Sequence, residues 1–369
     1  MEWLNCTKIR FLLLGFVAAI FLCGGTANAD FTFGEPTNLG PAVNSLYADS
    51  QPSISADGLS LYFRSNRPGG SGVADLWVTM WASTDDPWGA PLNLGTTVNS
   101  SADDLSPDIS ADGLSLFFDS RRSGGYGDRD LWVTTRASTN ENWVTPVNLG
   151  VTVNSSATDA CPHISPDGLS LFFASGRPGG YGDKDLWITT RASLDDEWDT
   201  PVNLGAIVNS SALDCCPSIS VDGRTLFFHS TRPGGYGGRD LWVTTRPTTR
   251  DPWAEPMNLG LTVNSSAYDV GPSVSADGRT LYFYSNRPGG SGNHDLWQAS
   301  IIPIVDFDGD GNIDTDDLLI LIDNWDTDES LCDIGPMPWG DGVVDIEDLK
   351  VFMSYWEQEN MPEIPDDDE

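Results

Sequence analysis

The stretch PSISADGLSLYFRSNRPGGSGVADLW, residues 52–77, decides the fold because near-copies of it recur at one fixed step. Its Asp-Gly pair begins at residues 57, 112, 167, 222 and 277, and its closing Asp-Leu-Trp begins at residues 75, 130, 185, 240 and 295. Asn-Leu-Gly begins at residues 38, 93, 148, 203 and 258, again 55 residues apart. One period shared by three motifs indicates a repeat architecture.

Each repeat has the pattern of short strands joined by tight turns. Asp57-Gly58 is a hairpin signal, because both residues tolerate positive φ. Leu61 and Phe63 alternate with their neighbours, as in a half-buried strand. A Gly-rich connector, a second β-rich run from Leu76 and a strand around Trp88 complete the unit. These features predict an all-β five-bladed propeller with four-stranded antiparallel blades over residues 30–300.

The two ends of the repeat region predict how the ring closes. The fifth unit lacks the tryptophan and Asn-Leu-Gly strand that should follow Leu296-Trp297. The N-terminal segment supplies it, because Phe33 stands where the other units have Trp88, Trp143, Trp198 and Trp253. We therefore expect residues 31–40 to complete the last blade and leave no open sheet edge.

The repeat motif also resembles a known group of propellers. The pattern P-x-[IV]-S-x-D-G-x-x-L-x-F, followed by the Gly-rich turn and Asp-Leu-Trp, is similar to the WD-repeat-like propellers of TolB-type and other exported bacterial proteins. The resemblance covers residues 30–300 and implies the fold. It implies no single activity, because the family includes binding, scaffolding and enzyme-appended members.

The first residues predict export. Lys8 and Arg10 precede an apolar run from Phe11 to Cys23, which is too short for a membrane span. Ala27-Asn28-Ala29 is a cleavage signal, so residues 1–29 form a signal peptide and the mature chain starts at Asp30. We expect a secreted or periplasmic monomer that does not span the membrane.

The charge is strongly acidic and uneven. The net charge is −35, and residues 301–369 hold 22 Asp and Glu against one Lys. This balance argues against nucleic acid as a partner. Residues 361–369 are expected to be a solvated acidic tail.

Three charged series recur in every unit. Their members begin at Asp49, Arg67 and Asp75 and repeat every 55 residues. They form either a ring of ligand-binding charges or a scaffold of ion pairs and turn caps, and their identity in every blade favours the scaffold. The Trp77 series is expected in the core. The Trp88 series lies beside polar turns, so we expect it to be partly exposed and the first place to look for glycan stacking.

Positions that differ between blades are better candidates for binding. One set precedes the recurrent Asp: Tyr47, Asp103, Thr158, Leu213 and Tyr268. A second set precedes the recurrent proline: Gln51, Ser106, Cys161, Cys216 and Gly271. A third lies inside the Gly-rich loop: Val73-Ala74, Asp128-Arg129, Asp183-Lys184, Gly238-Arg239 and Asn293-His294.

The cysteines of the mature chain are Cys161, Cys215, Cys216 and Cys332. Equivalent positions on neighbouring blades approach each other near the axis, so Cys161 and Cys216, or Cys161 and Cys215, are candidates for a cross-blade disulfide. The alternative is free thiols on the inner strands. No CxxC or His-x-x-His spacing occurs, so we do not expect a zinc site.

The C-terminal sequence DFDGDGNIDTDD, residues 306–317, matches an EF-hand calcium loop. Its expected ligands are Asp306, Asp308, Asp310, Asn312 through its carbonyl, Asp314 and Asp317, with Gly311 at the sharp turn. A second loop ends with Asp341, Asp345 and Asp348. Its first ligand position falls on Met337 unless the chain loops out and Asp333 takes that place.

Two calcium loops, each followed by a helix, resemble the type I dockerin domain over residues 304–357. We assign residues 301–360 to this module. The resemblance implies calcium as cofactor and docking to a cohesin-bearing scaffold protein, with Thr315-Asp316 and Ile346-Glu347 at the recognition positions. The alternative is a calcium-stabilised cap without such a partner.

The propeller sequence contains no enzyme signature. Its glutamates, Glu35, Glu141, Glu197 and Glu255, lie near the Trp88 series, and a glycosidase needs a paired carboxylate site. We assign no catalytic residue and expect a non-enzymatic exported protein whose propeller binds a protein or glycan. The alternative is a carbohydrate-active enzyme or an accessory subunit of a polysaccharide-degrading complex.

Overall fold

The computed structural model describes residues 31–81, 87–309, 311–327, 332–335 and 343–360. The signal peptide with Ala29 and Asp30, the candidate ligands Asp310 and Asp341, and the acidic tail lie outside the described residues. No helix in the described part of the chain is long and apolar enough to span a membrane.

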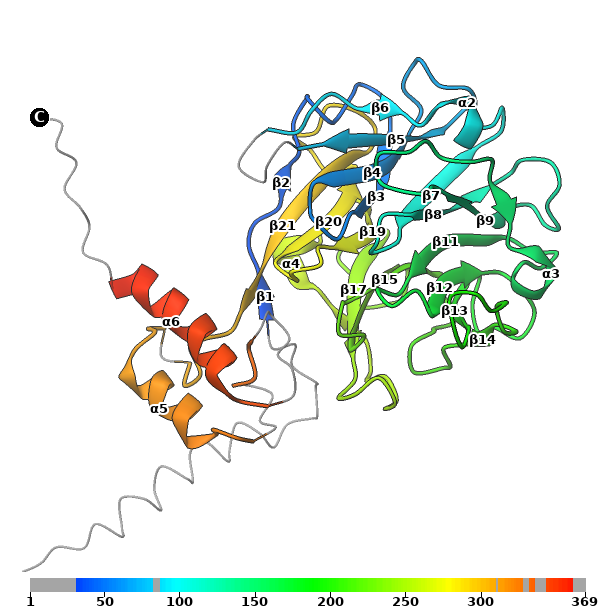
Figure 1. Ribbon diagram of the computed structural model, residues 1–369. Coiled ribbons are helices and arrows are strands. Elements are labelled where there is room, and N and C mark those ends of the chain that lie inside the picture. The colour runs from blue at the N-terminus through cyan, green and yellow to red at the C-terminus, as the bar shows by residue number, and fades with distance from the viewer. Residues whose placement is uncertain (1–30, 82–86, 310, 328–331, 336–342, 361–369) are drawn as a thin grey trace, which may run out of the picture.

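The predicted five-bladed propeller is confirmed, and Figure 1 shows its blades arranged around one axis. Each blade is a four-stranded antiparallel sheet. The first is β3 (Asp49–Ile54), β4 (Ser60–Ser65), β5 (Asp75–Met80) and β6 (Leu92–Asn93). The second blade is β7 (Asp104–Ile109), β8 (Ser115–Ser120), β9 (Asp130–Thr135) and β10 (Val147–Asn148). The third is β11 (Asp159–Ile164), β12 (Ser170–Ser175), β13 (Asp185–Thr190) and β14 (Val202–Asn203). The fourth is β15 (Asp214–Ile219), β16 (Thr225–Ser230), β17 (Asp240–Thr245) and β18 (Met257–Asn258).

The last blade is completed by the N-terminal segment, as predicted. It contains β19 (Asp269–Val274), β20 (Thr280–Ser285) and β21 (Asp295–Pro303). β2 (Thr37–Asn38) pairs with β21 so that Asn38 lies opposite Trp297. β1 (Phe31–Phe33) pairs with the extension of the same strand, past residue 300. The two ends of the ring are thereby joined in one sheet.

An asparagine after each Asn-Leu-Gly motif adds a second joint between blades, which the sequence analysis missed. Short helical turns precede several of them: α2 (Gly95–Val98), α3 (Gly150–Val153) and α4 (Gly260–Val263). The Asn99 side chain accepts from the Leu76 N–H at 2.9 Å and donates to the Leu76 carbonyl at 3.0 Å. Asn44 makes the same two bonds to Leu296, at 2.8 and 3.0 Å, and so fastens the ring closure.

The hydrophobic core lies largely between blades. Leu61 and Phe63 of the first blade pack in one cluster with Tyr282 and Leu296 of the last. The Trp77 series is buried in all five blades, as expected. Burial of this apolar surface stabilises the ring only when neighbouring blades are present.

The recurrent arginine and aspartate form a scaffold, which confirms the structural interpretation. Arg67 Nη2 lies 2.6 Å from Asp49 Oδ1 and donates to the Val43 carbonyl at 2.6 Å. The guanidinium lies over the rings of Phe63 and Trp77. The same pair occurs at 2.5–2.6 Å in the other blades: Arg122–Asp104, Arg177–Asp159, Arg232–Asp214 and Arg287–Asp269.

The Gly-rich loop is a joint between blades. Asp75 closes it by accepting hydrogen bonds from the N–H groups of Ser71 and Gly72. A Cβ on Gly72 would lie 2.1 Å from the Ala102 carbonyl oxygen of the next connection, so only glycine fits. The constant residues of this loop therefore have a structural role.

Two helices with their own core follow the propeller (Figure 1). Asp314 caps α5 (Thr315–Asp323) in a capping box with Asp317. α5 and α6 (Ile346–Asn360) surround a cluster that includes Phe307, Leu321 and Phe352.

Replacing one scaffold arginine should destabilise the whole ring. In Arg177→Met the fully buried Asp159 loses its ion-pair partner, which we expect to cost about 3 kcal/mol of unfolding free energy. Urea unfolding measures the change, and Arg250→Met, at an exposed position, is the control. Equal unfolding midpoints for the two variants would contradict the scaffold role.

Candidate functional site at the propeller axis

The axis is surrounded by the residues that precede the inner-strand prolines. All five have positive φ: Gln51 (56°), Ser106 (48°), Cys161 (51°), Cys216 (51°) and Gly271 (63°). This conformation is strained for residues other than glycine and often marks functional positions. Each inner strand shifts register at this point, as in Ser50/Ser53, and such bulges redirect side chains.

These residues line a small axial cavity together with the inner-strand prolines, Asp108 and His163. His163 Nδ1 lies 3.0 Å from Asp108 Oδ1, and Asp108 Oδ2 accepts from the Ile164 N–H at 2.7 Å. Asp108 therefore links two blades at this end of the axis. Gly271 leaves room for Tyr284, whose ring would lie 2.6 Å from an added Cβ.

At the other end of the inner strands lies a set of five residues, one from each blade, of which three are cations. The carbonyls of Ala74, Arg129, Lys184, Arg239 and His294 each accept from the aspartate N–H that begins the inner strand of the next blade, at 2.8–2.9 Å. These residues are thus held beside the axis. They are the second members of the variable loop pairs that the sequence analysis singled out.

A second set of five residues lies on the second strand of each blade, directly paired with the inner strand. Its members are Arg64, Asp119, Ala174, His229 and Tyr284, paired in register with Ser50, Leu105, Ala160, Cys215 and Val270. The sequence analysis did not identify this set. The detectable signal was one repeat position with five different side chains.

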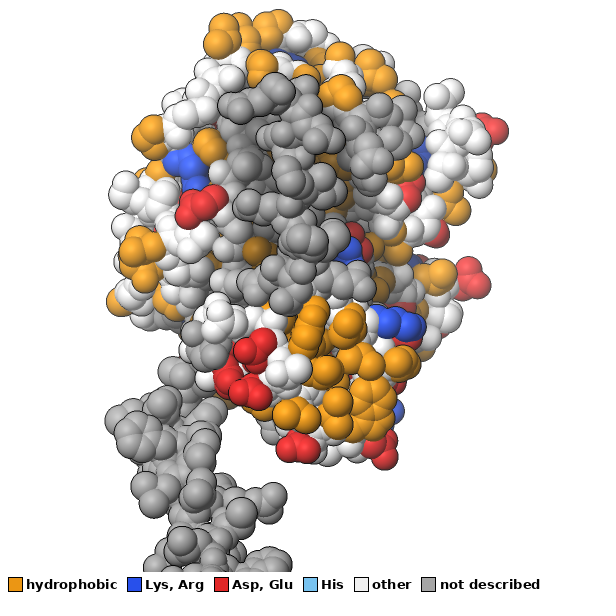
Figure 2. All heavy atoms as spheres, turned by 90° about the vertical axis from the view of Figure 1, so that its left-hand side faces the viewer, with side chains coloured by type: hydrophobic (Ala, Val, Ile, Leu, Met, Phe, Trp, Pro, Cys, Tyr) orange, Lys and Arg blue, Asp and Glu red, His pale blue; other side chains and the backbone are white. Residues whose placement is uncertain are grey.

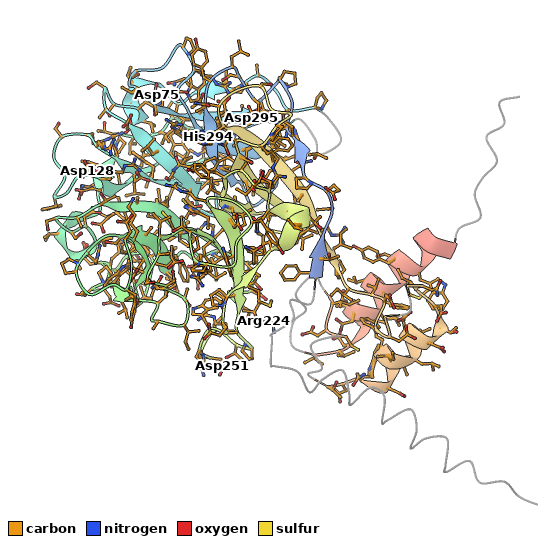
Figure 3. The ribbon with its side chains drawn as sticks, turned by 180° about the vertical axis from the view of Figure 1, so that it is seen from behind. Asp75, Asp128, Arg224, Asp251, His294 and Asp295 are labelled. Atoms are coloured by element: carbon orange, nitrogen blue, oxygen red, sulfur yellow. The ribbon has the colours of Figure 1, made fainter. Side chains whose placement is uncertain are left out.

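Arg64, Arg129, Lys184 and Arg239 together form what we call the axial cationic cluster. The Nε of Arg64 is buried and has no hydrogen-bond partner in the described part of the chain. Burial lowers the pKa of His294, and the charges of Arg64 and Arg239 lower it further. His294 therefore stays mostly neutral beside the cations, and its ring packs edge-on against Tyr284. Figure 3 labels His294 next to Asp295.

Asp119 is a buried acid within this set. Its Oδ2 lies 3.5 Å from Arg129 Nη1, and its Oδ1 accepts from the Cys161 N–H at 3.0 Å. Burial raises the pKa of Asp119 to about 6, although Arg129 opposes the shift. A carboxyl group with such a pKa exchanges protons near neutral pH.

The predicted approach of Cys161 to Cys215 and Cys216 is observed. The Cys161 sulfur lies 2.7 Å from that of Cys216 and 3.7 Å from that of Cys215. All three side chains are buried, and no disulfide is present among the described residues. His229, the register partner of Cys215, is also buried.

The rim differs from the expected tryptophan surface. Trp143, Trp198 and Trp253 are half-buried under Arg136, Arg191 and Arg246, whose guanidinium carbons lie 4.1–4.4 Å from the ring centroids. In the first blade Trp81 stands at the repeat position of these arginines, and Trp88 is buried against it. The predicted partial exposure was therefore wrong for Trp88. Tyr47 and Tyr268 are instead exposed.

Three predicted calcium ligands lie together in the first C-terminal loop. Carboxylate oxygens of Asp306, Asp308 and Asp317 are within 4.8 Å of one another. Asp317 also accepts from the Phe307 and Asp308 N–H groups. Asp314 caps the following helix, and Asn312 lies in the same loop.

The second loop repeats this arrangement around Asp333. Asp348 accepts from the N–H groups of Ile334 and Gly335 at 2.6 and 2.7 Å, as Asp317 does after Asp306. Asp345 Oδ1 accepts from the Glu347 N–H at the start of α6. In this hydrogen-bond pattern Asp333 has the place that Asp306 has in the first loop.

Comparisons with known proteins give distant structural similarities only. No family model and no curated protein sequence matches the chain. Among solved structures, it is similar to α-L-arabinofuranosidase from Lactobacillus brevis, with a TM-score of 0.49, 11% identity and coverage of 71% of this chain and 92% of that one. It is also similar to the family 117 glycoside hydrolase Zg3597 of Zobellia galactanivorans. The TM-score is 0.48 and the identity 11%, and the match covers 76% of this chain and 93% of that one.

TolB proteins are similar at the same level. TolB from Acinetobacter baumannii gives a TM-score of 0.43 and 12% identity over 69% of this chain, which spans about half, 54%, of that protein. A putative TolB from Agrobacterium tumefaciens gives 0.44 and 16% over 74% of this chain and 99% of that one.

Asp119 should make stability depend on pH. Its raised pKa means that the folded protein holds a proton that the unfolded chain releases, so wild-type stability falls as pH rises from about 4 to about 6. The side chain of Asp119→Asn stays neutral, so this variant avoids the wild-type loss of roughly 3 kcal/mol of unfolding free energy. We expect its advantage in urea unfolding to grow over that range at constant saturating calcium. The exposed Asp112→Asn is the control, and parallel pH profiles for wild type and Asp119→Asn would contradict the assignment.

Proposed function

We propose that this is an exported, polysaccharide-directed protein whose axial cationic cluster binds an acidic polysaccharide. The observation that carries the proposal is the gathering of Arg64, Arg129, Lys184 and Arg239 beside the axis of a chain with a net charge of −35. Repeat symmetry does not require these cations, because the same positions hold Ala74 and Ala174 in other blades.

The chemistry suits carboxylated or sulfated sugars. Guanidinium groups bind such groups through paired hydrogen bonds, and the buried Arg64 Nε offers an unused donor. The exposed rings of Tyr47 and Tyr268 provide apolar faces for sugar rings. Arg239 lies 5.5 Å from the Tyr268 ring centroid, which brings charge and ring together.

The same site bears on whether the protein is an accessory subunit or an enzyme. Asp119, with a pKa of about 6, is the candidate acid, whereas its complete burial beneath Arg129 favours binding without turnover. Release of new reducing ends distinguishes the two roles. A sugar release that is lost in Asp119→Asn would assign the enzymatic one.

We also propose that the C-terminal module binds calcium and docks to a cohesin-like partner. The clustered oxygens of Asp306, Asp308 and Asp317 support the metal site. Exposed apolar side chains support a partner surface: Leu319, Ile322, Trp325, Val343 and Ile346. Figure 2 shows hydrophobic and acidic side chains side by side on the lower part of this face.

The polysaccharide proposal predicts charge-dependent binding. Polygalacturonate and dextran sulfate should bind the full mature chain, whereas neutral dextran should not, and affinity should fall as salt rises. Lys184→Gln should weaken binding about fivefold, the effect of roughly 1 kcal/mol. Calorimetry with the exposed Arg250→Gln as control measures it. Binding of neutral dextran alone, or equal loss in both variants, would overturn the proposal.

Calcium binding should depend on the clustered carboxylates. In the full chain, Asp306→Asn/Asp308→Asn should weaken the tighter calcium site at least about tenfold, because two charged ligands become neutral. The exposed Asp323→Asn on α5 should not. Calcium titration followed by calorimetry and helical circular dichroism makes the comparison. Identical titrations for both variants would contradict the first-loop site.

A further inference from the structure

We propose that Cys161, Cys215, Cys216 and His229 form a binding site for a thiophilic d¹⁰ cation, Zn²⁺ or Cu⁺, inside the propeller beneath the axial cationic cluster. The site is separate from the carboxylate loops, and none of its ligands belongs to the axial cationic cluster. It joins two blades, because Cys161 belongs to β11 and the other three residues belong to β15 and β16.

The sulfur positions suit a shared ion. Ligand atoms of the three cysteines lie within 4.8 Å of one another. Two of their separations, 3.7 Å for Cys161–Cys215 and 3.9 Å for Cys215–Cys216, are close to the edge of a tetrahedron with bonds of about 2.3 Å. The Cys161–Cys216 separation of 2.7 Å must widen by about 1 Å on binding.

His229 gives an independent reason to expect a ligand. It is 2% exposed, and neither ring nitrogen has a hydrogen-bond partner in the described part of the chain. Such a group is costly to bury unless something binds it. It lies directly opposite Cys215 on the neighbouring strand, where side chains share one face. Its ring nitrogens do not lie within 4.8 Å of all three sulfurs, so the imidazole must shift to become the fourth ligand.

Two cations, Arg129 and Lys184, lie near the sulfurs. On binding, each thiol releases its proton to solvent and each sulfur donates an electron pair to the metal, with no change of oxidation state. Three thiolates and Zn²⁺ leave one negative charge, which the nearby Arg129 and Lys184 compensate. Soft sulfur ligands prefer Zn²⁺ and Cu⁺ to the calcium that oxygen ligands bind.

A small cavity at the opposite end of the axis borders the site. The small axial cavity is lined by Cys161 and Cys216 as well as by Asp108 and His163. The rival state is the cross-blade disulfide between Cys161 and Cys216, which would use two of the three sulfurs and leave His229 without a partner.

The test uses the full mature protein, reduced and stripped of metal without oxygen, in excess calcium to fill the carboxylate loops. Co²⁺, a spectroscopic substitute for zinc, should give thiolate-to-metal charge-transfer absorption at one equivalent, and Zn²⁺ should displace it. Native mass spectrometry should show one bound Zn²⁺ or Cu⁺. Cys215→Ser should abolish the charge-transfer band, and Cys332→Ser, outside the cluster, should retain it.

His229→Phe keeps a ring of similar size and tests the fourth ligand. It should weaken zinc binding at least about tenfold. Copper(I), which three thiolates suffice to hold, should be affected less. If Cys215→Ser fails to fold, protection of three thiols from alkylation by zinc in the wild-type protein tests the same site. A Cys161–Cys216 disulfide in protein isolated from the export compartment, or a charge-transfer band unchanged in folded Cys215→Ser, would overturn the proposal.

Discussion

The buried pair between Arg67 and Asp49, with its four copies, is the interaction on which the rest of the propeller depends. It fixes the start of each inner strand to the loop that ends the second strand. A charge buried this completely is tolerated only when its partner and hydrogen bonds are in place. The arginine also donates to the Val43 carbonyl and covers Phe63 and Trp77, so one side chain aligns a strand, a turn and the core.

This repeated scaffold allows the axis to vary. Each blade is held by its own arginine–aspartate pair, its asparagine hydrogen bonds and its glycine contact with the next blade. Residues that face the axis therefore contribute little to the stability of the ring. Arg64, Asp119, Ala174, His229 and Tyr284 occupy one repeat position with five different chemistries. The cations, the buried acid and the cysteine cluster are therefore asymmetric features built on a symmetric frame.

The sequence predicted the fold well because the fold depends on local, repeated signals. The period of 55 residues, the Asp-Gly turns and the missing strand after Trp297 were sufficient for five blades and their closure. The candidate site was predicted only in part. Arg129, Lys184 and Arg239 were recognised as variable, but their convergence depends on the ring geometry. Asp119 and His229 lie on an ordinary alternating strand, and the sequence signal for them is that their repeat position differs in every blade. Their burial is seen only in the structure.

The proposed binding of an acidic polysaccharide by an acidic protein depends on how the charges are distributed. Exposed charges separated by more than about 8 Å are largely screened at physiological ionic strength, so the acidic C-terminal module contributes little to the potential at the axis. What a ligand meets there is the local set, in which Asp119 pairs with Arg129 whereas Arg64, Lys184 and Arg239 lie nearby. Low solvent exposure strengthens these charges further, because the surrounding protein screens them less than water does. The proposed binding at the axis thus depends on the local charges of the axial cationic cluster and little on the net charge of the chain.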